Sequence, residues 1–559
     1  MSSSAASAPT PLVAVGERLR RAKELVLSIR LAYVLGALLV AQWLALLALA
    51  LTVRHNGWLY YAGGDQLWHY SGAYLLAHGH LPPTFVGYGW SIVLLPLAWL
   101  AGPNLVSALP GIVLANTLVL LPIALLCVYG IASRLAGRLF GYFADTVWIA
   151  LPYLGILFVE PGYHQKYTEL TLPQLLGLTS VPDFPATVAL LVAAYLCLRA
   201  TETTSWHAAA AAGLACGYSL AIKPSNAIFL FAPAIFLLAS RWSALPIFAA
   251  GLAPAVLTLA LWKFRGLGQL AAAPAEPIRL AAGPMDLIHR IYSPKLGSWA
   301  HLGQVLDSLR EHFWIARVLE WLPVAGCIGL LARSRRGFLL IGSWFIPFFL
   351  IKGTYFAASV EDASFFRLMM PAFPAYALLA AATVLLVPRT RAQPAHPSPS
   401  LTGSRLTLAV GAAAAVFAAV PLGIIAATPP LHDGGTKAVR EAASLVPVST
   451  RLVPDATVVG KSVRLTWHQN PARGAAVFYR ILRAGPHGGG MACAGTPRNA
   501  SNDCRLFMDA VGATRVTTYA DKPGPGTWTY RIGASANWLD DYAYGDVYVT
   551  SPPVTVTVP

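Results

Sequence analysis

Charged residues are scarce in this sequence. Asp, Glu, Lys and Arg together make up 11% of its 559 residues, against roughly 25% in a typical soluble protein. Apolar stretches long enough to cross a hydrocarbon core about 30 Å thick recur along most of the chain before residue 430. The composition therefore excludes an ordinary soluble domain and predicts a polytopic α-helical membrane protein.

Acidic residues are the scarcer charged class, and the formal net charge is +16. In a membrane protein such an excess indicates basic residues at the membrane edges, where they orient the chain and meet anionic lipid headgroups. We therefore expect membrane lipids, and no nucleic acid, as partners of the basic surface.

Cysteine is also rare, with six residues in the chain. No Cys-x-x-Cys pair and no His/Cys cluster occurs, which argues against a structural zinc site. Cys493 and Cys504 lie together in a loop-rich C-terminal region, and an extracytoplasmic location would favour a disulfide between them. The other four fall in or at the ends of apolar runs, where cysteine is usually a small apolar residue: Cys127, Cys197, Cys216 and Cys327.

About eleven apolar runs predict transmembrane helices. They cover residues 31–53, 104–132, 139–159, 185–200, 207–222, 224–240, 243–262, 313–333, 337–356, 367–387 and 406–428. Residues 1–30 predict a basic cytoplasmic tail, because the first run is too long for a signal peptide. Arginine recurs in the short loops on the side of this tail, so the positive-inside rule places the C-terminus outside a plasma membrane.

The outer loops of this topology are residues 54–103, 160–184 and 263–312. Within the first loop, the apolar run 89–102 is short for a span and predicts an interfacial or re-entrant helix. Within the third, residues 283–313 predict amphipathic helices on the outer face that could cover a lipid ligand.

Residues 431–450 predict a linker, and residues 451–559 an extracytoplasmic all-β sandwich. The segments with alternating polar and apolar residues, which predict strands, are 462–467, 476–484, 513–520, 526–536, 545–550 and 554–558. Trp467 in an early strand and Tyr530 after "KPGPGTWT" resemble the core tryptophan and corner tyrosine of fibronectin type III domains.

Polar residues gather where the chain leaves the first span, in "GGDQLWHY" (63–70). Asp65 is followed four residues later by His69, so both would share one face of a helix. A plain turn or helix-capping role for Asp65 is the alternative to a functional one. His69 could orient Asp65 or simply face the membrane interface beside Trp68.

Three segments resemble the GT-C class of membrane glycosyltransferases, which includes protein O-mannosyltransferases and arabinosyltransferases. "DQLWHYSGAYLLAHGHLPPTF" has that class's first-loop acid, Asp65, followed by Gly79 and Pro82 in register. "GLACGYSLAIKPSNAI" places Lys223 at the outer end of a helix, and "FFRLMMPAFPAYALL" places Arg367 at the outer start of another. The resemblance covers residues 30–390 and depends on the order and sidedness of these segments.

This resemblance implies transfer of a sugar from a polyprenyl-phosphate donor to a glycan, lipid or protein acceptor during cell-envelope or glycoprotein assembly. Asp65 would act as the general base on the acceptor hydroxyl. Basic groups would hold the phosphate and stabilise its growing charge, although snorkelling to lipid headgroups is the alternative role for each of them. These groups are Lys223 and Arg367 first, then Lys263, Arg265 and Lys352.

The second outer loop adds Glu160 and His164 as candidate substrate-binding residues. Related enzymes can place a second acid in this loop, and Asp183, just before the next span, is also present there, with helix capping as the alternative role. Many GT-C members have paired acids in the first loop, whereas this chain has Asp65-Gln66. Because Gln66 cannot bind a cation strongly, a divalent metal is doubtful, and no cofactor is expected.

Two alternatives remain from the residues alone. A lipid or glycan transporter would also cross the membrane many times, but the sequence shows no matched halves and few intramembrane charges. A non-catalytic membrane scaffold could equally display the β-sandwich outside. Loss of sugar transfer in an Asp65→Asn variant would favour the enzyme.

Overall fold

The structure is a computed structural model that describes most of the chain. The described residues are 24–52, 64–82, 84, 86–102, 105–203, 205–267, 297–361, 363–387, 404–430, 451–470, 478–484, 509–514, 516–535 and 549–559. The expected disulfide between Cys493 and Cys504, the linker 431–450 and most of the N-terminal tail lie outside these residues.

Helices make up nearly all of the described residues before residue 430. The α-helices are α2 (Leu31–Thr52), α3 (Gly64–Ala77), α4 (Gly89–Ala101), α5 (Leu105–Ala115), α6 (Leu121–Ala136), α7 (Arg138–Phe158), α8 (Pro161–Lys166), α9 (Leu172–Leu175), α10 (Asp183–Thr203), α11 (Trp206–Ile222), α12 (Phe231–Arg241), α13 (Leu245–Leu267), α15 (Trp299–His312), α16 (Ala316–Arg333), α17 (Arg335–Gly337), α18 (Ser343–Gly353), α19 (Ser364–Met369), α20 (Phe373–Ala382), α21 (Ser404–Ala414) and α22 (Val420–Ala427). Short π-helical and 3₁₀ segments join several of them: η1 (Asn116–Leu120), η2 (Tyr167–Thr171), η3 (Pro224–Leu230), η4 (Trp242–Ala244), η5 (Phe338–Gly342), η6 (Met370–Ala372), η7 (Thr383–Leu386) and η8 (Ala415–Ala419).

Eight helical stretches in the described residues are long and apolar enough to cross a membrane. They are Leu31–Thr52, Ala108–Ala136, Arg138–Phe158, Asp183–Thr203, Pro224–Gly266, Arg335–Gly353, Ser364–Leu386 and Arg405–Ala427. The chain is thus a polytopic α-helical membrane protein, as its composition predicts.

A helix also occupies each of the other predicted spans. Pro224–Gly266, with 43 residues, contains two of them, because the backbone leaves the helical region at Arg241 (φ −161°, ψ 78°) and α13 starts a new helix. α11 has 17 residues, and α16 carries three charged side chains, so neither meets the length and apolarity of a free-standing span. α4 is a 13-residue apolar helix, as short as the sequence predicts.

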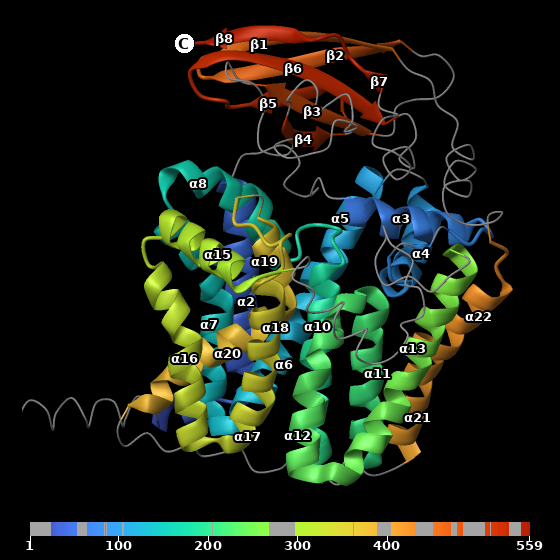
Figure 1. Cartoon of the computed structure of the whole chain (residues 1–559), viewed down its shortest axis with the longest axis vertical. Helices are drawn as coiled ribbons and strands as arrows, with labels where there is room; N and C mark the ends of the chain where they lie inside the picture. The colour runs from blue at the N-terminus through green and yellow to red at the C-terminus, as the bar shows by residue number, and fades with distance from the viewer. Residues whose placement is uncertain are drawn as a thin grey trace, which may run out of the picture.

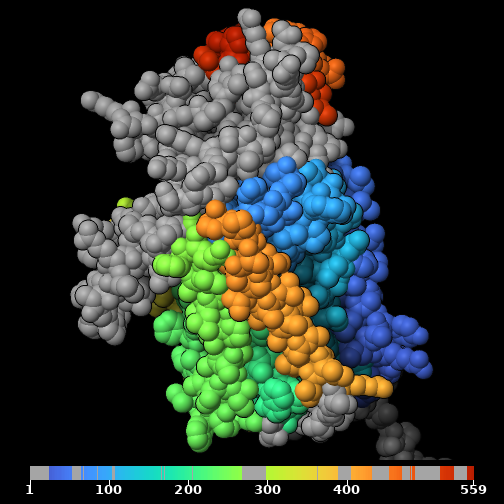
Figure 2. All heavy atoms as spheres, turned by 90° about the vertical axis from the view of Figure 1, so that its right-hand side faces the viewer, coloured from blue at the N-terminus to red at the C-terminus, as the bar shows by residue number. Residues whose placement is uncertain are grey.

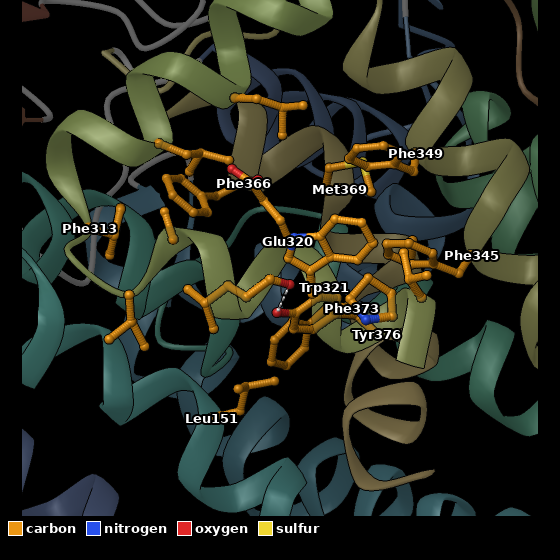
Figure 3. Close-up of a pocket in the computed structure, with 18 of the residues that line it drawn as sticks. Leu151, Phe313, Glu320, Trp321, Phe345, Phe349, Phe366, Met369, Phe373 and Tyr376 are labelled. Carbon is orange, nitrogen blue, oxygen red and sulfur yellow. Dashed lines mark hydrogen bonds between the residues drawn. The ribbon is translucent and has the colours of Figure 1, made fainter. Parts of the chain in front are cut away.

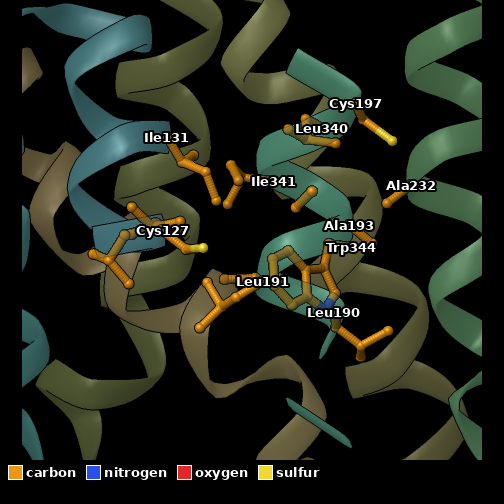
Figure 4. Packing of buried hydrophobic residues seen from close by; sticks show 14 of the residues in the cluster. Cys127, Ile131, Leu190, Leu191, Ala193, Cys197, Ala232, Leu340, Ile341 and Trp344 are labelled. Atoms are coloured by element: carbon orange, nitrogen blue, oxygen red, sulfur yellow. The ribbon is translucent and has the colours of Figure 1, made fainter. Parts of the chain in front are cut away.

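The centre of the bundle is a continuous apolar core in which α6, α10 and α18 meet (Figure 4). Cys127 and Cys197 lie in this core, where they pack as small apolar residues. Trp344 is fully buried, and its indole N–H donates to the carbonyl of Pro371 at 2.9 Å. This bond satisfies the one polar atom of a large side chain in an apolar interior.

The bundle has two different ends (Figure 1). The strands lie beyond the end where α3, α4 and α8 are found, which we call the sandwich end; α17 lies at the other, which we call the opposite end. Along the side shown in Figure 2, α22 runs next to α13, and α21 packs against α11. Arg265, near the end of α13, donates to the carbonyl of Ile425 on α22.

The described residues after 450 form a β-sandwich of two antiparallel sheets. The strands are β1 (Arg451–Val459), β2 (Ser462–Asn470), β3 (Phe478–Ala484), β4 (Asp509–Thr514), β5 (Thr518–Asp521), β6 (Gly526–Ser535), β7 (Val549–Thr550) and β8 (Val554–Val558). One sheet has the order β1-β2-β5; the other has the order β4-β3-β6-β7, and β8 also pairs with β6. The segment 513–520, predicted as one strand, instead contains the end of β4 and most of β5.

The sandwich core is built around Trp467 and Tyr530, both buried. The Tyr530 hydroxyl donates to the carboxylate of Asp521 at 2.7 Å, and Arg483 donates to the same carboxylate at 2.8 Å. This polar group within the core joins β3, β5 and β6, so it fixes the two sheets relative to each other.

Candidate functional site

Four charged side chains form a continuous ion chain at the sandwich end. Asp65 pairs with the Nη2 of Arg367, whose Nε lies 3.0 Å from an Asp183 carboxylate oxygen. The second Asp183 oxygen pairs with the ammonium of Lys223. The order Asp65–Arg367–Asp183–Lys223 alternates in sign, so each cation meets a carboxylate.

The members of this ion chain differ in exposure. The Asp183 side chain is fully buried, and those of Lys223 and Arg367 are 16% and 17% exposed. Asp65 is 37% exposed, so its carboxylate is open to a ligand. Asp183 is therefore the internal anchor that holds both cations, and Asp65 is the accessible acid.

Local sequence features place these groups at helix ends. Asp65 and Asp183 lie in the first turns of α3 and α10, where the helix dipole favours negative charge. Lys223 follows the last residue of α11 in an extended conformation, because Pro224 after it disfavours a helical residue. Arg367 lies on α19, which begins after Ala363 in the left-handed region (φ 63°).

Backbone packing holds Lys223 in place. A Cβ atom on Gly87 would lie 2.1 Å from the carbonyl oxygen of Ala221, so glycine is needed there for the chain before α4 to reach the end of α11. The neighbouring Thr84 carbonyl accepts a hydrogen bond of 2.6 Å from Lys263. Lys263 is buried and lies beside the ion chain, where it interacts electrostatically with His69.

His69 and Gln66 occupy the same end of α3 as Asp65, and both are 1% exposed. The side-chain amide oxygen of Gln66 accepts a hydrogen bond of 2.6 Å from the hydroxyl of Ser180, in the segment that leads to Asp183. Burial, with the nearby charges of Lys263 and Lys223, lowers the pKa of His69 to about 3. His69 is therefore neutral at physiological pH, and the lowered pKa makes it a weak base there.

A second polar cluster lies near Glu160. His312 bonds Glu160 at 2.7 Å and Glu361 at 2.6 Å, and its ring stacks on Tyr163. Burial alone would lower the pKa of His312, but the two carboxylates outweigh it and raise that pKa. The same pairing with His312 lowers the pKa of Glu361. The cluster joins the end of α15 to the segments before α8 and α19.

An apolar cavity of about 740 Å³ lies between α7, α15, α16, α18, α19 and α20 (Figure 3). Phe365, Phe366 and Met369 contribute to its wall, and Arg367 lies between them on α19 without lining the cavity itself. Along α16 the lining residues Trp321 and Ile328 are more than half exposed. The cavity is therefore an open groove that shares α19 with the ion chain.

The described site residues do not suit a divalent cation. Asp65 and Asp183 are both bonded to Arg367, so a fixed positive charge already lies between them. A second cation in that position would be repelled. Among the described residues, no group of three or more His, Cys, Asp or Glu side chains is arranged to hold a metal ion.

The structure therefore brings some of the sequence candidates together and separates others. Asp65, Lys223 and Arg367 belong to the ion chain, with His69 and Lys263 next to it. Arg265 instead bonds a carbonyl of α22, and Glu160 belongs to the His312 cluster. His164 is exposed on α8.

The sequence analysis missed the role of Asp183. The residue was named in the second loop with helix capping as its plain explanation, and its pairing with Lys223 and Arg367 was not predicted. Asp183 lies in the first turn of α10, and an acid in that position is favoured in any helix. A stronger signal was its place at the end of a predicted loop in a chain with few carboxylates.

No protein-family model and no curated protein sequence matches this chain. Among solved structures, the chain is similar to the crystal structure of the Archaeoglobus fulgidus oligosaccharyltransferase in its apo form, with 14% sequence identity and a TM-score of 0.39. The match covers 75% of this chain and 58% of that protein, so the chain spans a little over half of its length.

Proposed function

We propose that this chain is a membrane glycosyltransferase of the GT-C type that transfers a sugar from a polyprenyl-phosphate donor to an acceptor hydroxyl. The observation that carries the proposal is the ion chain Asp65–Arg367–Asp183–Lys223 at a helix-bundle end. It combines one accessible carboxylate with two cations held by a buried one. Sugar transfer from a phosphate leaving group requires a general base for the acceptor hydroxyl and cations that stabilise the phosphate.

The cations can bind the donor phosphate without leaving Asp183. A lysine ammonium has three N–H donors and an arginine guanidinium has five, so each keeps donors for phosphate oxygens. When the phosphate engages Arg367, it competes with Asp65 for the guanidinium and frees that carboxylate. Lys352, over the ring of Tyr355 and in electrostatic contact with Lys223 and Asp183, adds a third cation.

The reaction then has a defined balance. The acceptor oxygen forms a bond to the anomeric carbon as the bond from that carbon to the phosphate oxygen breaks. The acceptor's proton passes to Asp65, and the electron pair of the broken bond leaves on the polyprenyl phosphate. Lys223 and Arg367 stabilise the additional negative charge that develops on the phosphate.

The apolar groove supports a lipid-linked donor. Its volume of about 740 Å³ is within the range of small-molecule sites, roughly 300–1,000 Å³. A prenyl chain entering along α16 would lie against Phe366 and Met369, with its phosphate at the neighbouring Arg367. This arrangement keeps the chain in apolar surroundings while the charged group reaches the cations.

We also propose that the sandwich end faces the outside. The opposite end carries Arg134, Arg199, Arg241 and Arg333, at the ends or starts of helices, and basic residues favour the cytoplasmic side. The sandwich, with its resemblance to a fibronectin type III domain at Trp467 and Tyr530, would then meet the acceptor glycan, lipid or protein. The acceptor belongs to cell-envelope or glycoprotein assembly.

The test compares Asp65→Asn with Asp307→Asn, because Asp307 is an exposed carboxylate on α15. Purified protein in liposomes is given radiolabelled polyprenyl-phosphate mannose or arabinofuranose with acceptor membranes. Loss of the base is expected to lower transfer by about 100-fold or more, whereas Asp307→Asn transfers normally.

Donor binding is read out separately, through the groove residue Cys327. Mass spectrometry of maleimide-treated protein should show that the donor protects Cys327 in both wild type and Asp65→Asn. Normal transfer by Asp65→Asn would overturn the assignment of the base. Transport of the lipid without transfer would favour a flippase instead.

A further inference from the structure

Two buried nitrogen atoms next to Asp65 lack hydrogen-bond partners. They are the Nε2 of Gln66 and the Nδ1 of His69, and neither finds a partner among the described residues. Each side chain is 1% exposed, so bulk water does not reach them. Buried polar atoms in native proteins are normally paired, and a polar ligand beside Asp65 would pair these two atoms, which lie three residues apart on one helix.

The surroundings restrict where that ligand lies. Gln66 is held by Ser180, three residues before Asp183, and His69 is in electrostatic contact with Lys223. Since positions 66 and 69 share a helical face, both nitrogen atoms lie on the side of α3 that meets the ion chain. The missing group is therefore next to the proposed phosphate position.

The chemistry of the two side chains restricts what the ligand is. The Gln66 amide is a donor at Nε2, and a neutral imidazole nitrogen donates or accepts according to its tautomer. A hydroxyl group complements both, because it accepts from the amide and can serve either role toward the imidazole. The nearby cations are already engaged, Lys223 with Asp183 and Lys263 with the Thr84 carbonyl.

We infer that Gln66 and His69 bind hydroxyl groups of the sugar that is being transferred, an inference that rests on the proposed function. The transferred sugar is the part of the donor covalently joined to the phosphate, so its hydroxyls lie within reach of a group that faces Lys223. The acceptor approaches from the accessible side of Asp65. Gln66 and His69 are sugar-binding residues and take no part in proton transfer.

The binding experiment compares two lipids on the full-length protein: polyprenyl-phosphate mannose and polyprenyl methyl phosphate, a sugar-free phosphodiester of the same charge. Wild type should bind the sugar-bearing lipid about tenfold or more tightly. His69→Phe should bring that ratio close to one, and Gln66→Met should lower it. His78→Ala, at the exposed end of α3, should keep the wild-type ratio.

Stability separates this role from a structural one. Because the Nδ1 atom of His69 has no partner in the ligand-free protein, His69→Phe should unfold at the same temperature as wild type or higher. A histidine with a structural role, or one that holds a buried water, would instead leave the sugar preference unchanged when replaced.

The outcomes divide cleanly between the two proposals. A wild-type ratio near one, or an unchanged ratio in His69→Phe, overturns the sugar-binding inference while leaving the proposed function intact. If polyprenyl phosphate binds no better than the uncharged polyprenol, the proposed function itself fails. The same preparations answer both questions.

Discussion

The two ends of the helical bundle use the same kinds of charged residues in different ways. At the opposite end, Glu202 lies 3.2 Å from Arg134 and 3.7 Å from Arg199, and all three side chains are less than 15% exposed. Arg134 also donates to the Gly130 carbonyl at 2.8 Å. At the sandwich end, Asp65 is 37% exposed.

The two ends differ in how fully their polar groups are paired within the protein. The cluster around Glu202 joins α6 to α10, and each of its three charged side chains has a partner of opposite charge within the protein. The ion chain leaves Asp65 open and has buried nitrogen atoms of Gln66 and His69 beside it without partners. Polar groups without a hydrogen-bond partner in the protein are expected at functional sites, because the substrate supplies the partner when it binds.

The largest effect should come from removing the buried anchor. Asp183→Asn leaves Lys223 and Arg367 without their shared carboxylate, and breaking a buried ion pair costs about 3–5 kcal/mol. We expect a much lower unfolding temperature for the purified protein and loss of transfer. Both are measured on the same reconstituted samples.

Glu202→Gln is the matched variant at the opposite end. It should cost less stability, since the Arg134 guanidinium keeps its bond to the Gly130 carbonyl, and transfer should persist in the protein that folds. If Asp183→Asn and Glu202→Gln lost sugar transfer equally, the sandwich end would not be the functional one of the two ends.

A smaller effect concerns pH and the cluster of Glu160, His312 and Glu361. Because the pKa of His312 is raised, its ion pairs stabilise the folded protein fully below pH 6.5, the ordinary value. This stabilisation is lost as the pH rises through the raised pKa. Because the pKa of Glu361 is lowered, its pairing stabilises the folded protein above pH 4.5, the ordinary value, and this stabilisation is lost as the pH falls through the lowered pKa. The cluster should therefore stabilise α15 most between these values.

The measurement is the difference in unfolding temperature between wild type and His312→Gln across this pH range. The effect should be roughly 1 kcal/mol, because both carboxylates are more than a third exposed and solvent screens them. Glu202→Gln supplies the contrast, because an arginine partner stays charged above pH 6.5. A His312→Gln difference that grows with pH would contradict the assignment.

The smallest effect concerns backbone conformation at the two ends. At the sandwich end Ala363 has φ 63°, whereas at the opposite end the turn between α6 and α7 uses Gly137 with φ 104°. Ala363→Gly should stabilise the protein by up to about 1 kcal/mol, since relief of left-handed strain exceeds the added entropy of the unfolded chain.

Gly137→Ala should have the opposite sign, because a left-handed position there receives a side chain. Thermal unfolding compares the two substitutions directly. Destabilisation by Ala363→Gly would show that the Cβ atom of this fully buried residue contributes more through packing than its conformation costs.

Much of the fold follows from local patterns. Each predicted span is a helix, and the predicted short helix 89–102 corresponds to α4, because the length of an apolar run is a local property. The strand prediction failed at 513–520, where alternation continues through the break between β4 and β5. A one-dimensional pattern does not show where a chain crosses from one sheet to the other.

The site was less predictable than the fold. The candidates Asp65, Lys223 and Arg367 were chosen through motif order, whereas Asp183 was one of several residues of the second loop and had helix capping as its plain explanation. Arg265 shares the sidedness of the other basic residues, but in the structure it bonds the Ile425 carbonyl. The side of the membrane on which a basic residue is predicted limits it to one membrane edge. It does not specify which group that residue bonds there.

The sequence by itself determined that the chain crosses a membrane, ends in a strand-rich domain and carries few acids, because composition and periodicity are local quantities. Only the tertiary structure decided which charges meet. Arg367 bonds Asp183, 184 positions away, and Asp65, 302 positions away. Such partners are selected by how the helices pack, since burial makes an unpaired charge costly and leaves paired arrangements as the stable ones.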